Sequence, residues 1–175
     1  MDSQHYQLSE EIGAILHAHQ WQLSSAESCT GGWIARCITD VPGSSAWFET
    51  GFVTYSNTAK QRLLGAPKSL FEGDQAPGAV SAETVTAMAE GALQQAKAHF
   101  AVATSGIAGP DGGSPEKPVG TVWIGWAWRG QGHEVHSQAN VYVFDGDREA
   151  VRQQSVTRAL EGLLARLQTQ AQALG

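Results

Sequence analysis

Ser28 is a residue whose position in this chain could support nucleophilic chemistry. It lies in the stretch Ala26 to Gly32, where a predicted strand turns into a predicted helix. Backbone N–H groups at a helix start are unpaired and favour negative charge, so a serine there could attack a carbonyl group while the amides stabilise the oxyanion. The pattern alone favours a simpler role, in which Ser28 or Thr30 caps the helix. Cys29 is a second candidate nucleophile, although a small buried filler is the better interpretation of a free cysteine.

Lys60 is a candidate general base. It falls in the first turn of a predicted helix, where a cation opposes the helix dipole, although most lysines in such places are simply solvated. If Lys60 were enclosed beside Ser28, desolvation would lower its pKa, and a neutral amine could then accept a proton. Tyr55 and Asn57 flank Lys60 and could orient a ligand or relay a hydrogen bond. Their simpler roles are strand-end packing and helix capping respectively.

Two further stretches could hold a ligand. The glycine-rich segment from Ser105 to Gly113, which contains Gly106 and Gly109, would let the backbone approach a ligand closely. It is neither a Walker A loop nor a GxGxxG motif, and a tight surface loop is an equally good interpretation. Arg148 and Arg152 share one face of a predicted helix, where they could grip a phosphate or carboxylate or could simply be solvated.

Alternating helical and strand patterns surround these residues and must position them. Helices are predicted over residues 8–19, 31–39, 57–64, 82–97 and 148–171, with Ser81 and Asp147 as the N-caps of the last two. Strands are predicted over residues 21–26, 50–55, 100–104, 119–128 and 133–144, the fourth covered on both faces and the fifth at an edge. This order is typical of a single α/β domain over residues 1–175 with a mixed sheet, whose functional groups lie on loops at the strand ends.

The composition argues against several classes of protein. The chain has 175 residues, with 11 Lys and Arg against 17 Asp and Glu, which gives a net charge of −6. The absence of a broad basic field disfavours nucleic-acid binding but leaves room for a local phosphate site. The 6 histidines show no metal-ligand spacing with cysteines or carboxylates, so we predict no metal. The 2 cysteines cannot form a disulfide scaffold, the polar start is unlike a signal peptide, and no apolar run approaches the ~20 residues of a membrane span. A cytoplasmic protein without membrane contact is the simplest interpretation.

Taken together, the motifs resemble those of the CinA C-terminal domain family, whose stand-alone members are nicotinamide-nucleotide amidases. The matching segments occur in order over about residues 8–165, and they are Ala26 to Gly32, Gly43-Ser44-Ser45, Gly51 to Lys60, Gly78 to Ser81, Ser105 to Gly113, Lys117 to Val122 and Gly146-Asp147-Arg148. The usual N-terminal partner domain of CinA proteins is absent, so we expect the stand-alone form. The resemblance implies a three-layer α/β/α sandwich with a mixed sheet, no metal or other cofactor, and a homo-oligomer.

The resemblance also implies an activity, the hydrolysis of nicotinamide mononucleotide to nicotinic acid mononucleotide and ammonia by a serine–lysine pair. Carried onto this chain, Ser28 is the nucleophile, Lys60 is the base, and Tyr55 lies beside them in the active site. We expect amides near Thr30 and Gly31 to hold the oxyanion.

The phosphate of this small-molecule nucleotide substrate would be held by the segment 105–113, by Arg148 or by the turn at Ser44-Ser45. The residues expected to bind the substrate are Thr30, Gly31, Ser45, Asn57, Ser105, Gly106, Gly109 and Arg148.

Two other hypotheses stay open at this stage. A non-catalytic nucleotide-binding or partner-binding module would have the same fold, and an amidase or esterase for another substrate would differ only in the shape of its pocket. The segment from Gly65 to Pro77 is a few residues longer than in typical family members, and Pro77 stands where a histidine or an aromatic residue is usual. We therefore expect one loop near the site to differ in shape, without effect on the catalytic pair.

Overall fold

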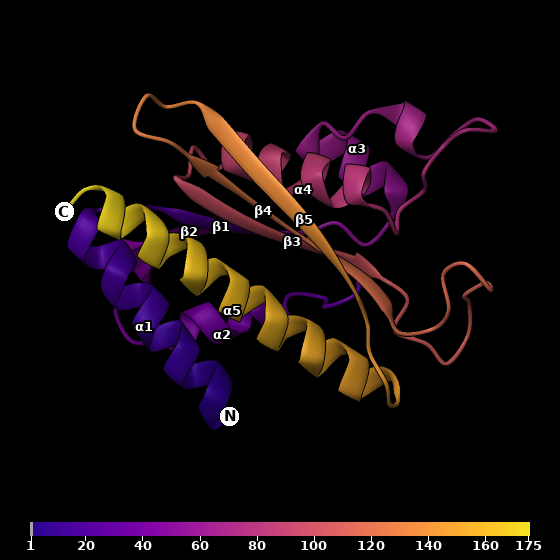
Figure 1. Ribbon diagram of the computed structural model, residues 1–175, viewed down its shortest axis with the longest axis horizontal. Helices are drawn as coiled ribbons and strands as arrows, with labels where there is room; N and C mark the ends of the chain where they lie inside the picture. The colour runs from indigo at the N-terminus through magenta and orange to yellow at the C-terminus, as the bar shows by residue number, and fades with distance from the viewer. Residues whose placement is uncertain (1) are drawn as a thin grey trace.

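A computed structural model of the chain describes residues 2–175, in which one five-stranded mixed sheet lies between two layers of helices (Figure 1). The strands are β1 (Leu23–Glu27), β2 (Phe48–Val53), β3 (Phe100–Gly106), β4 (Thr121–Arg129) and β5 (Val135–Val143). The helices are α1 (Ser3–His19), α2 (Trp33–Thr39), α3 (Asn57–Leu64), α4 (Ala82–Gln95) and α5 (Arg148–Ala173), with short 3-10 turns η1 (Ser44–Ala46) and η2 (Lys68–Leu70). The predicted α/β sandwich with a mixed sheet is confirmed.

The strand order of the sheet is β2-β1-β3-β4-β5. Strand β1 is parallel to both β2 and β3, whereas β4 runs antiparallel to β3 and to β5. The carboxyl ends of β1, β2 and β3 therefore lie at the same edge of the sheet, which is where functional groups collect in α/β proteins. Strand β4 is largely buried and β5 lies at the edge of the sheet, as predicted.

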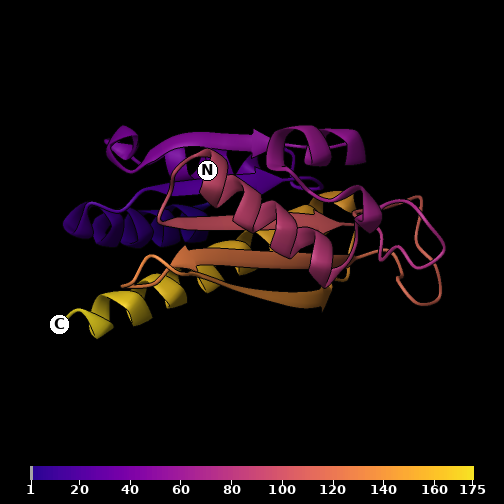
Figure 2. The same cartoon turned by 90° about the horizontal axis from the view of Figure 1, so that it is seen from above.

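Each face of the sheet packs against its own helices, because successive strand residues point to opposite faces. On one face, large side chains such as Leu23, Phe100 and Trp126 form a core with α1, α2 and α5. On the other face, small side chains such as Ala101 and Ala127 pack against α4, and α3 lies beside α4 at the carboxyl end of β2 (Figures 1 and 2). The small side chains let α4 lie close to the sheet.

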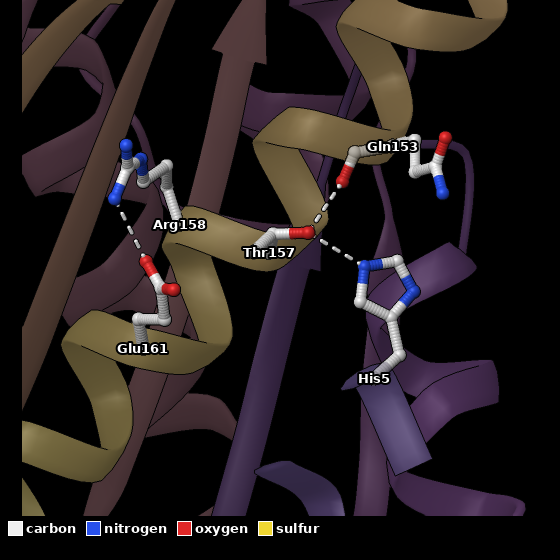
Figure 3. A network of polar contacts seen from close by, with 5 residues as sticks. All are labelled: His5, Gln153, Thr157, Arg158 and Glu161. Atoms are coloured by element: carbon white, nitrogen blue, oxygen red, sulfur yellow. Dashed lines mark hydrogen bonds and ion pairs between the residues drawn. The ribbon is translucent and has the colours of Figure 1, made fainter. Parts of the chain in front are cut away.

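Helix α1 begins at Ser3, five residues before the predicted start, because the side chain of Asp2 caps it by accepting from the N–H groups of Gln4 and His5. The apolar periodicity on which the prediction relied begins only later. Helix α1 then packs along α5, where His5 Nε2 lies 2.8 Å from Thr157 Oγ1, and Thr157 donates to the carbonyl of Gln153 (Figure 3). These contacts join the first helix of the chain to the last.

Other element boundaries moved by a few residues. Helices α3, α4 and α5 begin where they were predicted, and Ser81 and Asp147 cap α4 and α5 as expected. Strand β3 runs two residues further than predicted, since Gly106 still pairs with Val122, so the glycine-rich segment begins inside the sheet. Of the helices in residues 2–175, none is long and apolar enough to cross a membrane.

Candidate active site

Ser28 follows β1 directly, at the edge of the sheet where the parallel strands end. Its N–H donates to the carbonyl of Thr104 on β3 at 3.0 Å, which ties the start of the turn to the sheet. Glu27 pairs with Val53 at the end of β2, so the chain leaving β2 begins α3 beside this turn. Parallel pairing thus brings the serine and the helix that carries Lys60 together.

Lys60 points into the protein and meets Ser28. Its Nζ lies 3.1 Å from Ser28 Oγ and donates to the carbonyl of Tyr55 at 3.4 Å. The Lys60 side chain is 1% exposed and Ser28 is 8% exposed. Within residues 2–175 no carboxylate lies within ion-pair distance of Lys60.

Burial lowers the pKa of Lys60, because the ammonium form loses its hydration and gains no counter-ion. The lowered pKa favours the neutral amine within reach of the serine hydroxyl, which is the form that a general base for Ser28 requires. Cys29 differs, because burial raises the pKa of its thiol to about 11 and keeps it protonated. Its interpretation as a buried filler agrees with this structure.

A cavity of about 210 Å³ opens over Ser28 and Lys60. It gathers residues from the ends of three strands and from the start of α5. Those predicted to belong to the site are Ser28, Tyr55, Asn57, Lys60, Ser105, Gly106 and Arg148, and the wall is completed by Cys29, Ala79, Val80 and Ala108. Asn57 lines the cavity but does not cap α3, since Ser56 accepts from the N–H of Ala59 instead.

Arg148 lies at the mouth of this cavity and is held by neutral groups. Its Nη1 donates to the carbonyl of Gly109 at 2.8 Å, and its Nη2 donates to the hydroxyl of Tyr55 at 2.9 Å. In the described part of the chain no carboxylate forms an ion pair with it. The guanidinium charge is therefore free to attract an anionic group of a ligand. The expected role of Gly109 changes, because its carbonyl holds Arg148 in place rather than its backbone holding a phosphate.

The structure changes the expected roles of Thr30 and Gly31. The N–H of Gly31 already donates to the carbonyl of Ser28 at 3.0 Å, so it is not available to an oxyanion. The Thr30 hydroxyl donates to the buried Glu27 carboxylate at 2.7 Å and caps no helix. Across residues 2–175, no backbone carbonyl accepts from the N–H of Cys29 or Thr30, which leaves these two amides as the candidate oxyanion donors.

Ser45 does not reach the site within this chain. The turn η1 precedes β2 at the amino edge of the sheet, where Leu23 donates to the carbonyl of Trp47. Ser28 lies at the carboxyl edge, with the length of β1 between them. The prediction that Ser44-Ser45 could hold the phosphate is therefore wrong for a single chain, because a sequence motif does not state which end of a strand it occupies.

Sequence reasoning missed the groups that support the turn. Glu27 received no role, because its strand, Leu-Ser-Ser-Ala-Glu, is not apolar and does not predict that the carboxylate is buried. Arg152 was seen only as a partner of Arg148, yet it donates to the carbonyls of Cys29 and Thr30. Among residues 2–175, no cluster of three or more His, Cys, Asp or Glu side chains is arranged to hold a metal ion.

Comparison with known proteins agrees with this geometry. The family described as the CinA C-terminal domain matches residues 5–167. The chain belongs to the CinA C-terminal domain family. It is 57% identical over 157 residues to the nicotinamide-nucleotide amidohydrolase PncC of Pseudomonas putida, covering 90% of this chain and 93% of that protein. It is 52% identical over 163 residues to the protein of the same name from Escherichia coli strain K12, covering 93% and 94%.

A solved CinA superfamily structure from Klebsiella pneumoniae 700603 superposes with a TM-score of 0.82 at 37% identity, covering 94% of this chain and 98% of the other. The family resemblance of the sequence motifs is thereby confirmed.

Proposed function

We propose that this chain is a nicotinamide-nucleotide amidohydrolase, which converts nicotinamide mononucleotide to nicotinic acid mononucleotide and ammonia in the salvage of pyridine nucleotides. The observation that carries the proposal is the buried contact of 3.1 Å between Lys60 Nζ and Ser28 Oγ at the base of a cavity. Identity above 50% to proteins named PncC over most of both chains supports the choice of substrate.

The proposed reaction begins when neutral Lys60 takes the proton of Ser28. The serine oxygen attacks the carboxamide carbon, and the N–H groups of Cys29 and Thr30 stabilise the oxyanion that forms. Lys60 then passes its proton to the leaving nitrogen, and ammonia departs from an acyl-enzyme. Water, deprotonated by Lys60, cleaves the ester and restores the Ser28 hydroxyl.

The proposed position of the nucleotide follows from charge. Arg148 is an exposed cation at the cavity mouth and, among residues 2–175, has only neutral hydrogen-bond partners, so we assign it to the phosphate. Asn57, Ser105 and Gly106 line the same cavity and would contact the remainder of the substrate. The loop that ends at Pro77 lies at this side of the protein, where Lys117 Nζ donates to the Pro77 carbonyl at 2.9 Å.

The test incubates the purified protein with nicotinamide mononucleotide and measures the ammonia released and the identity of the product. Ser28→Ala and Ser45→Ala are assayed beside wild type. We expect acid product from wild type and from Ser45→Ala, whose exposed side chain lies at the far edge of the sheet. No product is expected from Ser28→Ala. Tight nucleotide binding without turnover would favour a binding module instead, and turnover only of other amides would point to a different substrate.

We further propose that the protein acts in the cytoplasm as a homo-oligomer and binds neither nucleic acid nor membrane. The net charge of −6 disfavours nucleic-acid binding, and both cysteines are free and buried. Strand β5 is an edge strand of nine residues without Asp, Glu, Lys, Arg or Pro, the residues that usually protect such edges from pairing. Light scattering that finds a monomer at micromolar concentration would overturn the oligomer.

A further inference from the structure

Arg152 lies behind the catalytic turn and outside the cavity that holds Ser28 and Lys60. It lines a separate hollow of about 400 Å³ together with Trp33 and Glu149. Its guanidinium lies over the ring of Trp33, 5.6 Å from the ring centre. In the described part of the chain it forms no ion pair with a carboxylate. A half-buried cation without a counter-ion suggests a role for its charge.

The hydrogen bonds of Arg152 go to the backbone of the catalytic turn. Its Nε donates to the carbonyl of Cys29 at 3.1 Å, and its Nη2 donates to the carbonyl of Thr30 at 3.3 Å. The Cys29 carbonyl and the Thr30 N–H belong to one peptide unit. Because a trans peptide is planar, its C=O and N–H point in opposite directions, and fixing the carbonyl also fixes the N–H.

The geometry of the turn indicates that the Thr30 N–H lies on the side of the Ser28 side chain. The Gly31 N–H donates to the carbonyl of Ser28, which closes a four-residue turn from Ser28 to Gly31. In such turns the N–H of the third residue lies on the side of the first residue's side chain, the arrangement seen when serine bonds to the amide two residues on. The Thr30 amide is thus placed, together with that of Cys29, to donate to the substrate oxyanion that forms when Ser28 attacks.

The other side of the turn is held by a buried carboxylate. Glu27 is fully buried, and it accepts from the hydroxyl of Thr30 at 2.7 Å and from the N–H groups of Ile34 and Ala35 at 2.8 and 3.1 Å. The N-cap of α2, Gly32, has no side chain that could do this. Thr30 is therefore hydrogen-bonded to Glu27 on its buried side and to Arg152 on its outer side.

We propose that Arg152 is a positioning residue that orients and polarises the Thr30 amide as an oxyanion donor, without touching the substrate. A cation on the carbonyl oxygen of a peptide draws electron density away from the N–H, which strengthens the hydrogen bond that this N–H donates. The inference rests on the proposed Ser28–Lys60 reaction. It predicts an effect on the chemical step and little effect on substrate binding.

The test compares Arg152→Ala, Arg152→Lys and Arg158→Ala in the full chain. Arg158 is an exposed arginine further along α5, paired with Glu161, and serves as the matched control. We expect kcat of Arg152→Ala to fall about 10²–10³-fold, the loss typical of one oxyanion donor, with KM changed by less than about threefold. Arg152→Lys keeps the charge but not the planar fork, so a loss of about tenfold is expected. Arg158→Ala should match wild type.

A second readout does not depend on the nucleotide. Covalent labelling of Ser28 by a fluorophosphonate depends on the nucleophile and on the oxyanion donors. The labelling rate of the Arg152 variants should therefore fall in parallel with kcat. If wild type labels but does not hydrolyse nicotinamide mononucleotide, the proposed substrate fails while labelling still decides the role of Arg152. Added guanidinium should partly restore labelling of Arg152→Ala. A raised KM with unchanged kcat, or unchanged labelling in folded Arg152→Ala or Arg152→Lys, would overturn the inference.

Discussion

Replacement of Lys60 by methionine should remove most of the activity and yet stabilise the protein at neutral pH. The side chain is 1% exposed and its Nζ lies 3.1 Å from Ser28 Oγ, so methionine keeps most of the apolar packing but removes the base. Loss of a general base costs about 10²–10⁴-fold in rate, which is roughly 3–5 kcal/mol of transition-state stabilisation. The same change also removes a desolvated amine, whose protonated form destabilises the folded protein.

The pH dependence of the stability gain follows from linkage. Desolvation lowers the pKa of Lys60 in the folded protein, whereas the unfolded chain keeps a value near 10.5. Below the folded pKa both states are protonated, and the folded state bears the full penalty, about 1.4 kcal/mol for each unit by which the pKa is lowered. Between the two pKa values the unfolded state binds the extra proton, so the stability of wild type rises with pH. The advantage of Lys60→Met should be largest at low pH and vanish above the ordinary lysine pKa.

Urea unfolding of both proteins at a series of pH values measures this difference, since contributions from other groups cancel. Lys68→Met is the matched control, because the Lys68 side chain is 71% exposed and forms a surface ion pair with Glu72. It should keep full activity and show almost no pH-dependent change in stability. Hydrolysis at the wild-type rate by Lys60→Met, or a loss of stability that is constant across pH, would refute the assignment of a desolvated base.

Three further changes test other parts of the site. Arg148→Gln should raise KM about tenfold or more with a smaller effect on kcat, because it removes a charged partner of the phosphate; unchanged KM in steady-state kinetics would remove Arg148 from the subsite. Gly91→Ala would place a methyl group against the Leu64 carbonyl between α4 and α3, so we expect about 1–3 kcal/mol of destabilisation in urea and lower activity, whereas wild-type stability would contradict the close packing. Burial raises the pKa of Cys29 to about 11, so iodoacetamide at neutral pH should leave the activity intact. Cys29→Ala should also remain active. Rapid inactivation by alkylation of Cys29 would show an accessible thiolate instead.

Features that depend on neighbours along the chain were predictable from the sequence. The caps Ser81 and Asp147 and the start of α3 at Asn57 were correct, because capping and helical periodicity involve residues only a few positions apart. The family resemblance singled out Ser28 and Lys60, and the order of elements indicated a mixed sheet. Pattern reasoning alone would have made Ser28 or Thr30 a helix cap, which neither is.

What only the tertiary structure decided is which of these groups meet. Parallel pairing of β1 with β2 places Ser28 beside α3 and leaves Ser45 at the opposite edge of the sheet. The contact between Arg152 and Cys29 spans 123 positions of sequence, and no local pattern reports it. Nor does spacing reveal that Gly31 already uses its N–H within the turn. Burial of Lys60 and its lowered pKa arise from the packing of α3 against α4 beside the turn that carries Ser28, because desolvation depends on every element that surrounds a group in space.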